Sequence, residues 1–296
     1  IPLRLVGSEM CIRDRNKASF CLIYIYLSII TMVINMKILI TGATSGIAYE
    51  TALKLLEQNN FVYLCTHTEE EKYLLKEKLA NKSNAKVYKL DVCNENDLKL
   101  LDILDYDVFW SHAGIGNGGA VLGISLDTIR KNYEVNVFKN IAVIKRAYEN
   151  MRHKNIEGKI FVTSSLAAYL PLTYLGAYTS SKAALSSLCY TMNKELKLIG
   201  SNISLTLIEL GAYHTGFNQV MIDNKERFLK PASTFYLYKD KVTKKQNNLF
   251  NLIEKKTLTA VSTKLAKQIS KKNPKFLIRT PLIQRLLVKL YIIFLR

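Results

Sequence analysis

Residues 36–48, Met-Lys-Ile-Leu-Ile-Thr-Gly-Ala-Thr-Ser-Gly-Ile-Ala, decide the fold of this chain. An apolar run leads directly into a turn with two glycines, and a helical pattern of apolar residues follows. Gly42 and Gly46 let the backbone turn tightly and approach a pyrophosphate, while the helix start offers unpaired N–H groups and a positive dipole end. The stretch therefore predicts a strand, a dinucleotide-binding turn and a helix. The residues expected to contact the dinucleotide here are Gly42, Thr44, Ser45, Gly46 and Ile47.

Six further strand-like runs follow, separated by helical patterns. This alternation predicts parallel strands joined by right-handed crossovers, with helices on both faces of a doubly wound sheet. No internal repeat or low-complexity linker divides the chain, so one α/β domain is expected. The runs lie near residues 61–66, 86–91, 107–111, 159–164, 203–209 and 276–279.

Tyr178 and Lys182 lie four residues apart, and Ser165 stands thirteen residues before Tyr178. Four residues are about one helical turn, so the phenol and the ammonium project from one helix face. An ammonium fixed beside a phenol lowers its pKa from about 10, which is typical of a general acid/base. Ser165 ends a buried strand, where α/β folds place their chemistry. Taken alone, the tyrosine–lysine spacing also fits a solvated helix face.

With both motifs in place, the chain from Met36 onward resembles the short-chain dehydrogenase/reductase family. The family motif T-G-x-x-x-G-x-G matches Thr41, Gly42 and Gly46, with Ala48 in place of the last glycine. The resemblance implies a single Rossmann-type domain with three α/β/α layers. It also implies an oxidoreductase that transfers a hydride between a nicotinamide and a carbonyl or alcohol carbon.

The resemblance assigns four catalytic residues, Asn136, Ser165, Tyr178 and Lys182. Tyr178 would supply the proton and Ser165 would orient the carbonyl oxygen. Lys182 would tune Tyr178 and bind the nicotinamide ribose, while Asn136 would hold a water that links Lys182 to solvent. The further residues expected at the cofactor are Thr66, His67, Asp91, Val92, Ala113, Gly114, Tyr178, Lys182, Gly211, Tyr213 and Thr215.

Two departures from the family pattern support a different class of function. Ser111-His112 replaces two asparagines after the fourth strand, and Leu210 replaces a proline before Gly211. A non-catalytic dinucleotide sensor or scaffold is therefore the alternative, although the complete catalytic set opposes it. His112 is expected to be hydrogen-bonded within the cofactor wall. With only four histidines and no paired Cys/His spacing, no metal site is expected.

The choice of cofactor depends on the end of the second strand. An acid there would bind the ribose hydroxyls and repel a 2′-phosphate. Thr66 and His67 occupy this position, which favours NADP, but no arginine is ready to bind the phosphate and three glutamates follow at 69–71. NADP is the expected cofactor, with NAD as the alternative.

Residues 1–35 are expected to be a non-native or untranslated extension of a domain over residues 36–280. Residues 5–15 look like the translated reading frame of a sequencing adaptor. Residues 20–35 form an almost uncharged run near the lower length limit of a membrane span. This run is either a signal anchor or upstream sequence read in frame. The second interpretation is favoured because Met36 stands directly before the first strand.

The C-terminal quarter carries most of the net charge of +18, since residues 221–296 hold 18 basic and 4 acidic side chains. Residues 281–296 predict a basic, apolar helix, which would lie on an anionic membrane or pack on its own domain or on a sister subunit. Nucleic-acid binding is not expected, because no recognised module accompanies the charge. A homodimer or homotetramer is expected.

Residues 216–256 are expected to form a substrate lid. Its aromatic residues favour an apolar pocket for a small carbonyl or alcohol compound: Phe217, Phe228, Phe235, Tyr236 and Tyr238. Cys65, Cys93 and Cys189 are expected to be buried thiols of a cytoplasmic protein.

Overall fold

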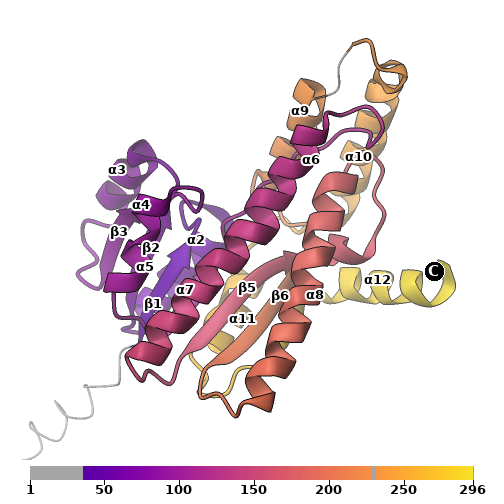
Figure 1. Cartoon of the computed structure of the whole chain (residues 1–296). Coiled ribbons are helices and arrows are strands. Elements are labelled where there is room, and N and C mark those ends of the chain that lie inside the picture. Colours follow the sequence, from indigo (N-terminus) through magenta and orange to yellow (C-terminus); the bar gives the residue numbers. More distant parts are fainter. Residues whose placement is uncertain (1–35, 229–230, 296) are drawn as a thin grey trace, which may run out of the picture. The chain divides into compact units, whose positions relative to one another are not determined.

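The computed structural model describes residues 36–228 and 231–295. At its centre lie seven parallel strands in the order β3-β2-β1-β4-β5-β6-β7 (Figure 1). The predicted strands and the doubly wound sheet are confirmed. The strands are β1 (Lys37–Thr41), β2 (Phe61–Thr66), β3 (Ala85–Lys89), β4 (Val108–Ser111), β5 (Lys159–Ser165), β6 (Ser204–Leu210) and β7 (Leu277–Thr280).

The central strands are apolar on both faces because helices cover both faces. Ile38 pairs with Val62 on one side and with Val108 on the other, and all three side chains are fully buried. Alternate residues along β1 point into different layers, so Ile38 and Leu39 belong to different core clusters.

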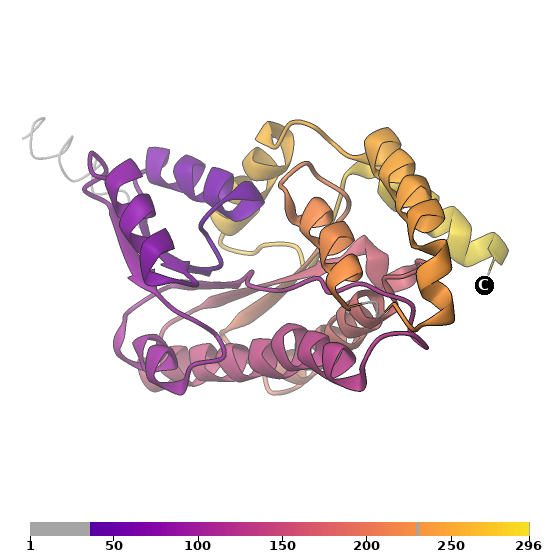
Figure 2. The same cartoon turned by 90° about the horizontal axis from the view of Figure 1, so that it is seen from above.

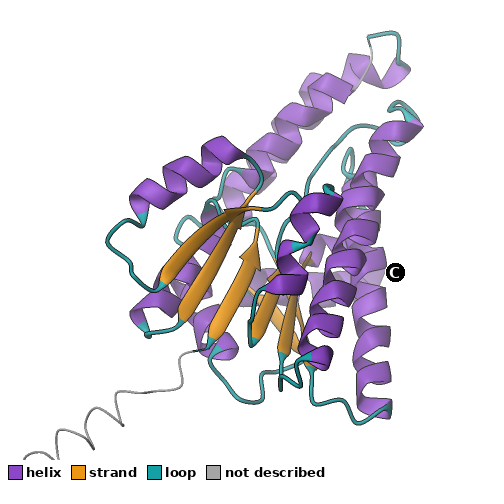
Figure 3. Ribbon diagram, turned by 60° about the vertical axis from the view of Figure 1, so that its left-hand side comes forward, coloured by secondary structure: helices purple, strands orange, loops and turns teal. Residues whose placement is uncertain are grey.

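The helices form two layers around the sheet (Figures 2 and 3). One layer holds α2 (Gly46–Glu57), α3 (Glu69–Lys78) and α11 (Thr259–Ile269). The other holds α4 (Glu95–Leu98), α5 (Leu100–Ile103), α7 (Asn140–His153) and α8 (Gly176–Leu198). The helix α6 (Leu126–Tyr133) continues into α7 through the π-helical turn η1 (Glu134–Lys139). The remaining elements are η2 (Leu166–Tyr169), α9 (Phe217–Phe228), η3 (Thr234–Tyr238), α10 (Lys239–Ile253) and α12 (Leu282–Leu295).

The strand order fixes where a ligand can bind. From β1 the chain builds outward to β2 and β3, then returns to β4 on the other side of β1. The connections after β1 and β4 therefore diverge and open a crevice at the carboxyl ends of the strands.

Two expectations on the chain's composition have different outcomes. Cys65 and Cys189 are buried, but Cys93 is exposed, because it lies in the turn before α4. The extension predicted over residues 1–35 lies outside the described residues. Between residues 36 and 295, leaving out 229–230, none of the helices combines the length and the apolar character that a bilayer crossing requires.

Candidate active site

The glycine turn between β1 and α2 admits no side chain at its first glycine. Gly42 and Gly46 have φ of +65° and +66°, where an L residue is strained. A Cβ on Gly42 would also lie 2.9 Å from the Cα of Ala113. The N-cap Ser45 makes no side-chain hydrogen bond to the first turn of α2, so this helix start has the features of an anion site. Ala48 is fully buried, so its methyl group fits the helix–sheet contact.

Hydrogen bonds hold the loop after β4 against this turn. Thr41 Oγ1 accepts from the N–H groups of His112 at 3.0 Å and Ala113 at 3.2 Å. Ser111 Oγ donates to Asn140 Oδ1 at 2.6 Å, and Asn140 Nδ2 donates to the carbonyl of Ala113 at 3.2 Å. Thr41 and Asn140 therefore brace this loop, in which Ser111 stands in place of an asparagine.

His112 has the predicted hydrogen bond. Its Nδ1 lies 3.0 Å from Thr163 Oγ1, which also accepts from Trp110 Nε1 at 2.8 Å. Burial, and after it the charge of Lys182, lowers the pKa of His112 to about 4. His112 is therefore neutral near pH 7, and the neighbouring cation is Lys182.

At the end of β2 the two predicted cofactor residues differ in exposure. Thr66 is fully buried, and its hydroxyl donates to the carbonyls of Thr68 and Tyr88. The side chain of His67 is 69% exposed. The Glu71 carboxylate accepts from the N–H groups of His67 and Thr68 in a capping box, and from the Thr44 hydroxyl at 3.3 Å. Glu71 thereby joins the start of α3 to the glycine turn.

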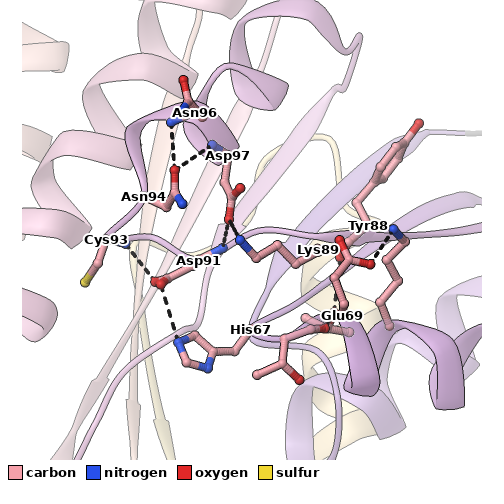
Figure 4. A network of polar contacts seen from close by, with 12 residues as sticks. His67, Glu69, Tyr88, Lys89, Asp91, Cys93, Asn94, Asn96 and Asp97 are labelled. Atoms are coloured by element: carbon pink, nitrogen blue, oxygen red, sulfur yellow. Dashed lines mark hydrogen bonds and ion pairs between the residues drawn. The ribbon is translucent and has the colours of Figure 1, made fainter.

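Asp91, one of the residues expected at the cofactor, lies in a polar network (Figure 4). One carboxylate oxygen accepts from the N–H of Cys93 at 2.9 Å, and the other lies 3.5 Å from His67 Nε2. The N–H of Asp91 donates to Asp97, which also pairs with Lys89. The network fixes the backbone after β3, where Val92 follows as a buried residue.

Asn136 and Lys182 converge on Gly114. A Cβ on Gly114 would lie 3.1 Å from Asn136 Oδ1 and 3.3 Å from Lys182 Nζ. Asn136 stands in the π-helical turn and binds both backbone groups of Ile115, and Lys182 Nζ donates to the carbonyl of Thr163 at 3.1 Å. Burial lowers the pKa of Lys182 to about 8.

Ser165 and Tyr178 meet at the carboxyl end of β5. Ser165 Oγ donates to the carbonyl of Leu210 at 3.1 Å and accepts from the N–H of Ala167 at 3.1 Å. Burial raises the pKa of Tyr178 to about 12, and the neighbouring hydroxyl of Ser165 opposes this shift. The prediction that Lys182 lowers this pKa below its ordinary value is wrong for this structure, because burial of the phenol dominates.

An apolar cover buries the Tyr178 ring. Leu175 and Met221 pack with it, and the ring of Phe217 lies 5.8 Å from its own. Phe235 and Tyr236 pack instead with Tyr174 and Ala120, while Tyr238 is 56% exposed. The side chain of Phe228 lies outside the described part of the chain.

The model of the family described as short chain dehydrogenase matches residues 36–226. The chain belongs to the short-chain dehydrogenase family. Its members are oxidoreductases that bind NAD(P), and a small-molecule substrate follows from this membership.

Two curated relatives and one solved structure resemble this dehydrogenase. A probable short-chain type dehydrogenase/reductase, VdlC of Helicobacter pylori, is 31% identical over 194 residues, covering 64% of this chain and 69% of the relative. An NADPH-dependent 3-dehydrocapnine reductase of Ornithobacterium rhinotracheale is 25% identical over 185 residues, covering 60% and 65%. A short-chain dehydrogenase/reductase of Burkholderia phymatum, in complex with NAD, superposes with a TM-score of 0.74 at 22% identity, covering 88% of this chain and 95% of that one. The last likeness supports the fold alone.

The loop after β6 completes the dehydrogenase's site. A Cβ on Gly46 would lie 3.2 Å from the Thr215 side chain, so Thr215 faces the glycine turn. The N–H of Gly211 donates to the carbonyl of Thr280, and the Tyr213 hydroxyl lies 2.8 Å from Thr280 Oγ1. The predicted residues of this loop are therefore divided between the glycine turn and β7.

A buried charge network packs against α8, and the sequence motifs did not reveal it. Glu209 has no exposed surface and accepts from Tyr169, Ser186 and Arg279. Ser186 Oγ also lies 2.8 Å from Ser164 Oγ, and the Ser164 hydroxyl donates to the carbonyl of Lys182. The lone glutamate in the apolar run of β6 was the one available signal. In residues 36–228 and 231–295, no three His, Cys, Asp or Glu side chains cluster as metal ligands would.

Proposed function

We propose that this dehydrogenase uses NADP to reduce the carbonyl group of a small, apolar compound, with Tyr178 as the proton donor. The observation that carries the proposal is the meeting of Ser165 and Tyr178 at the end of β5, one helical turn from Lys182 and beneath an apolar cover.

The residues present fit a nicotinamide dinucleotide. The tight turn at Gly42, whose backbone packs directly against Ala113, and the uncapped start of α2 suit a pyrophosphate. Asp91 and Val92 would lie at the adenine, and Lys182 would bind the nicotinamide ribose. When bound, the nicotinamide supplies the hydride.

Tyr178 would act as an acid. With a pKa of about 12 the phenol is protonated near pH 7, so it can donate to an oxygen that gains negative charge as the carbonyl is reduced. Ser165 would orient that oxygen through its hydroxyl. Lys182 would stabilise the phenolate that remains, and Asn136, which shares the surface at Gly114 with Lys182, would hold the water that returns a proton.

The cover over Tyr178 favours an apolar substrate. Leu175, Met221 and Phe217 offer carbon surface beside the phenol, so a charged group there would lose its hydration without a partner. A panel that compares aliphatic ketones with keto acids of equal length would test this. Faster turnover of the keto acids would exclude an apolar pocket.

NADP is the proposed cofactor because neither residue at the end of β2 is acidic. The Ornithobacterium relative is named as NADPH-dependent, which supports the same choice. The His67→Asp variant should move the ratio of kcat/KM for NADPH and NADH at least about tenfold toward NADH, because a carboxylate there repels the 2′-phosphate. His67→Asn, equal in size and neutral, is the control. An equal shift of this ratio in both variants would show that the cofactor preference does not depend on charge at residue 67.

The decisive test of the hypothesis that this protein is an enzyme is the Tyr178→Phe variant, with Tyr190→Phe on the same helix as the control. Loss of the general acid should lower kcat at least about a hundredfold while the Kd of NADP changes less than about twofold. The control should retain its rate. If NADP binds and no carbonyl compound is reduced by the unaltered chain, the sensor or scaffold function replaces this proposal.

A further inference from the structure

The helix α12 is fixed to the domain by one face. Gln284 and Val288 are buried. Gln284 Oε1 accepts from the N–H of Ala212 at 2.7 Å, and its Nε2 donates to the carbonyl of Ile253 at 2.8 Å. One side chain therefore ties the helix to the loop after β6 and to the end of α10.

The opposite face is apolar and exposed, and Figures 1 and 2 both show α12 running outward from the body of the domain. Its side chains recur every three or four residues and are 47–75% exposed. At 100° per residue they occupy one stripe of roughly 120°. This α12 face consists of Ile283, Leu286, Leu287, Leu290, Ile293 and Phe294.

Cations border the α12 face. Arg285 and Lys289, one turn apart, lie along one edge of the stripe, and residues 281–296 contain no acid. Lys255 and Lys256, both exposed, follow Glu254 after the end of α10 that Gln284 binds.

The cations gather although they repel one another. Burial, and after it the charge of Arg285, lowers the pKa of Lys264. Glu254, the acid next to Ile253, is already bound by His214 and Asn218. The cations around α12 would therefore be stabilised by an anion from outside the chain.

We propose that the α12 face docks on an anionic lipid bilayer. A helix with an apolar stripe and a cationic border lies in the plane of a membrane interface, with its apolar side among the acyl chains and its cations at the headgroups. With 14 residues, α12 is too short to span. A second copy of this face is a poorer occupant, because it offers cations and no carboxylate to Arg285 and Lys289.

The test is co-sedimentation of the full chain with vesicles of phosphatidylcholine alone and of phosphatidylcholine with phosphatidylglycerol. Binding should require the anionic lipid and weaken as ionic strength rises from about 0.05 M to about 1 M. Arg285→Gln with Lys289→Gln should lower the partition coefficient roughly 25-fold, at about fivefold per cation. Leu286→Gln with Leu290→Gln should lower it at least about tenfold.

Matched double variants at the C-terminal end of α8 and its cap residue Ile199 control for charge and apolar exposure in general. Lys194→Gln with Lys197→Gln, and Leu198→Gln with Ile199→Gln, alter exposed side chains away from α12 and should leave binding unchanged. The unfolding midpoint of each variant shows whether it is folded.

Three outcomes would overturn the proposal: no binding to anionic vesicles, equal losses in the α8 controls, or vesicle binding that folded α12 variants retain. If the α12 variants instead dissociate an oligomer seen by analytical ultracentrifugation without lipid, a second copy covers the face. Dinucleotide affinity should not change in any α12 variant, so this test is independent of the reductase activity.

Discussion

Replacing Gly42 by alanine should separate the cofactor turn's steric requirement from the general cost of a left-handed backbone. Gly42 has φ +65° and Gly200 has φ +60°. An alanine at either position carries the same strain, about 1 kcal/mol. A Cβ on Gly200 meets nothing within 4 Å, whereas on Gly42 it lies 2.9 Å from the backbone of Ala113. The pair is therefore matched in strain and differs in contact.

The structure sets the size of the difference. To restore an ordinary contact of 3.4 Å, the turn and the loop after β4 must separate by about 0.5 Å. Thr41 resists this separation, because its hydroxyl holds the N–H groups of His112 and Ala113. We expect Gly200→Ala to cost about 1 kcal/mol of unfolding free energy and Gly42→Ala about 3 kcal/mol. The same displacement should weaken dinucleotide binding at least about tenfold in Gly42→Ala alone.

Urea unfolding measures the first quantity, and isothermal titration calorimetry with NADP and NAD measures the second. Equal stability losses in the two variants, or a dinucleotide Kd in Gly42→Ala within about twofold of the unaltered chain, would refute the reasoning.

Two further predictions concern buried charge. The pKa of His112 is about 4 instead of 6.5, so between these pH values the unfolded chain binds a proton that the folded chain refuses. The contribution of His112 to the free energy of unfolding is complete above pH 6.5 and should fall by about 2 kcal/mol toward pH 4. This loss is smaller than full burial would give, because His112 is partly exposed. Urea unfolding across this range should show the loss in the unaltered chain and not in His112→Asn. Arg279→Met should cost about 3 kcal/mol, because Glu209 keeps a buried charge without its cation, whereas Arg146→Met, at a surface pair, should cost less than about 1 kcal/mol; equal losses would show that Glu209 does not depend on Arg279.

The sequence predicted the parts of the fold that depend on local patterns. Apolar runs of strand length located all seven strands, and the glycine spacing located the turn before α2, because both patterns lie within a few neighbouring residues. The four-residue spacing of Tyr178 and Lys182 likewise placed both on α8.

What escaped prediction depends on residues that are distant in the chain. The pKa of Tyr178 rises because Phe217 and Met221, some forty residues later, help to bury it. Glu209 is supported by Arg279, 70 residues further on. The burial of Thr66 follows from its position between neighbouring strands. No local spacing encodes these contacts, since they form only when the sheet is assembled.

The central position of β1 has a consequence during protein synthesis. Its first partner, β2, and the strand β3 that pairs with β2 are complete by Lys89, but the other edge of β1 stays unpaired until β4, which ends at Ser111, has been made. At roughly 5–20 residues per second, a ribosome needs on the order of a few seconds to make this interval. During that time Ile38 and Ile40 stand at the open edge of a three-stranded nascent sheet, where another chain can pair with them. Aggregation of this protein should therefore respond to translation speed between β3 and β4 more than to speed anywhere after β5.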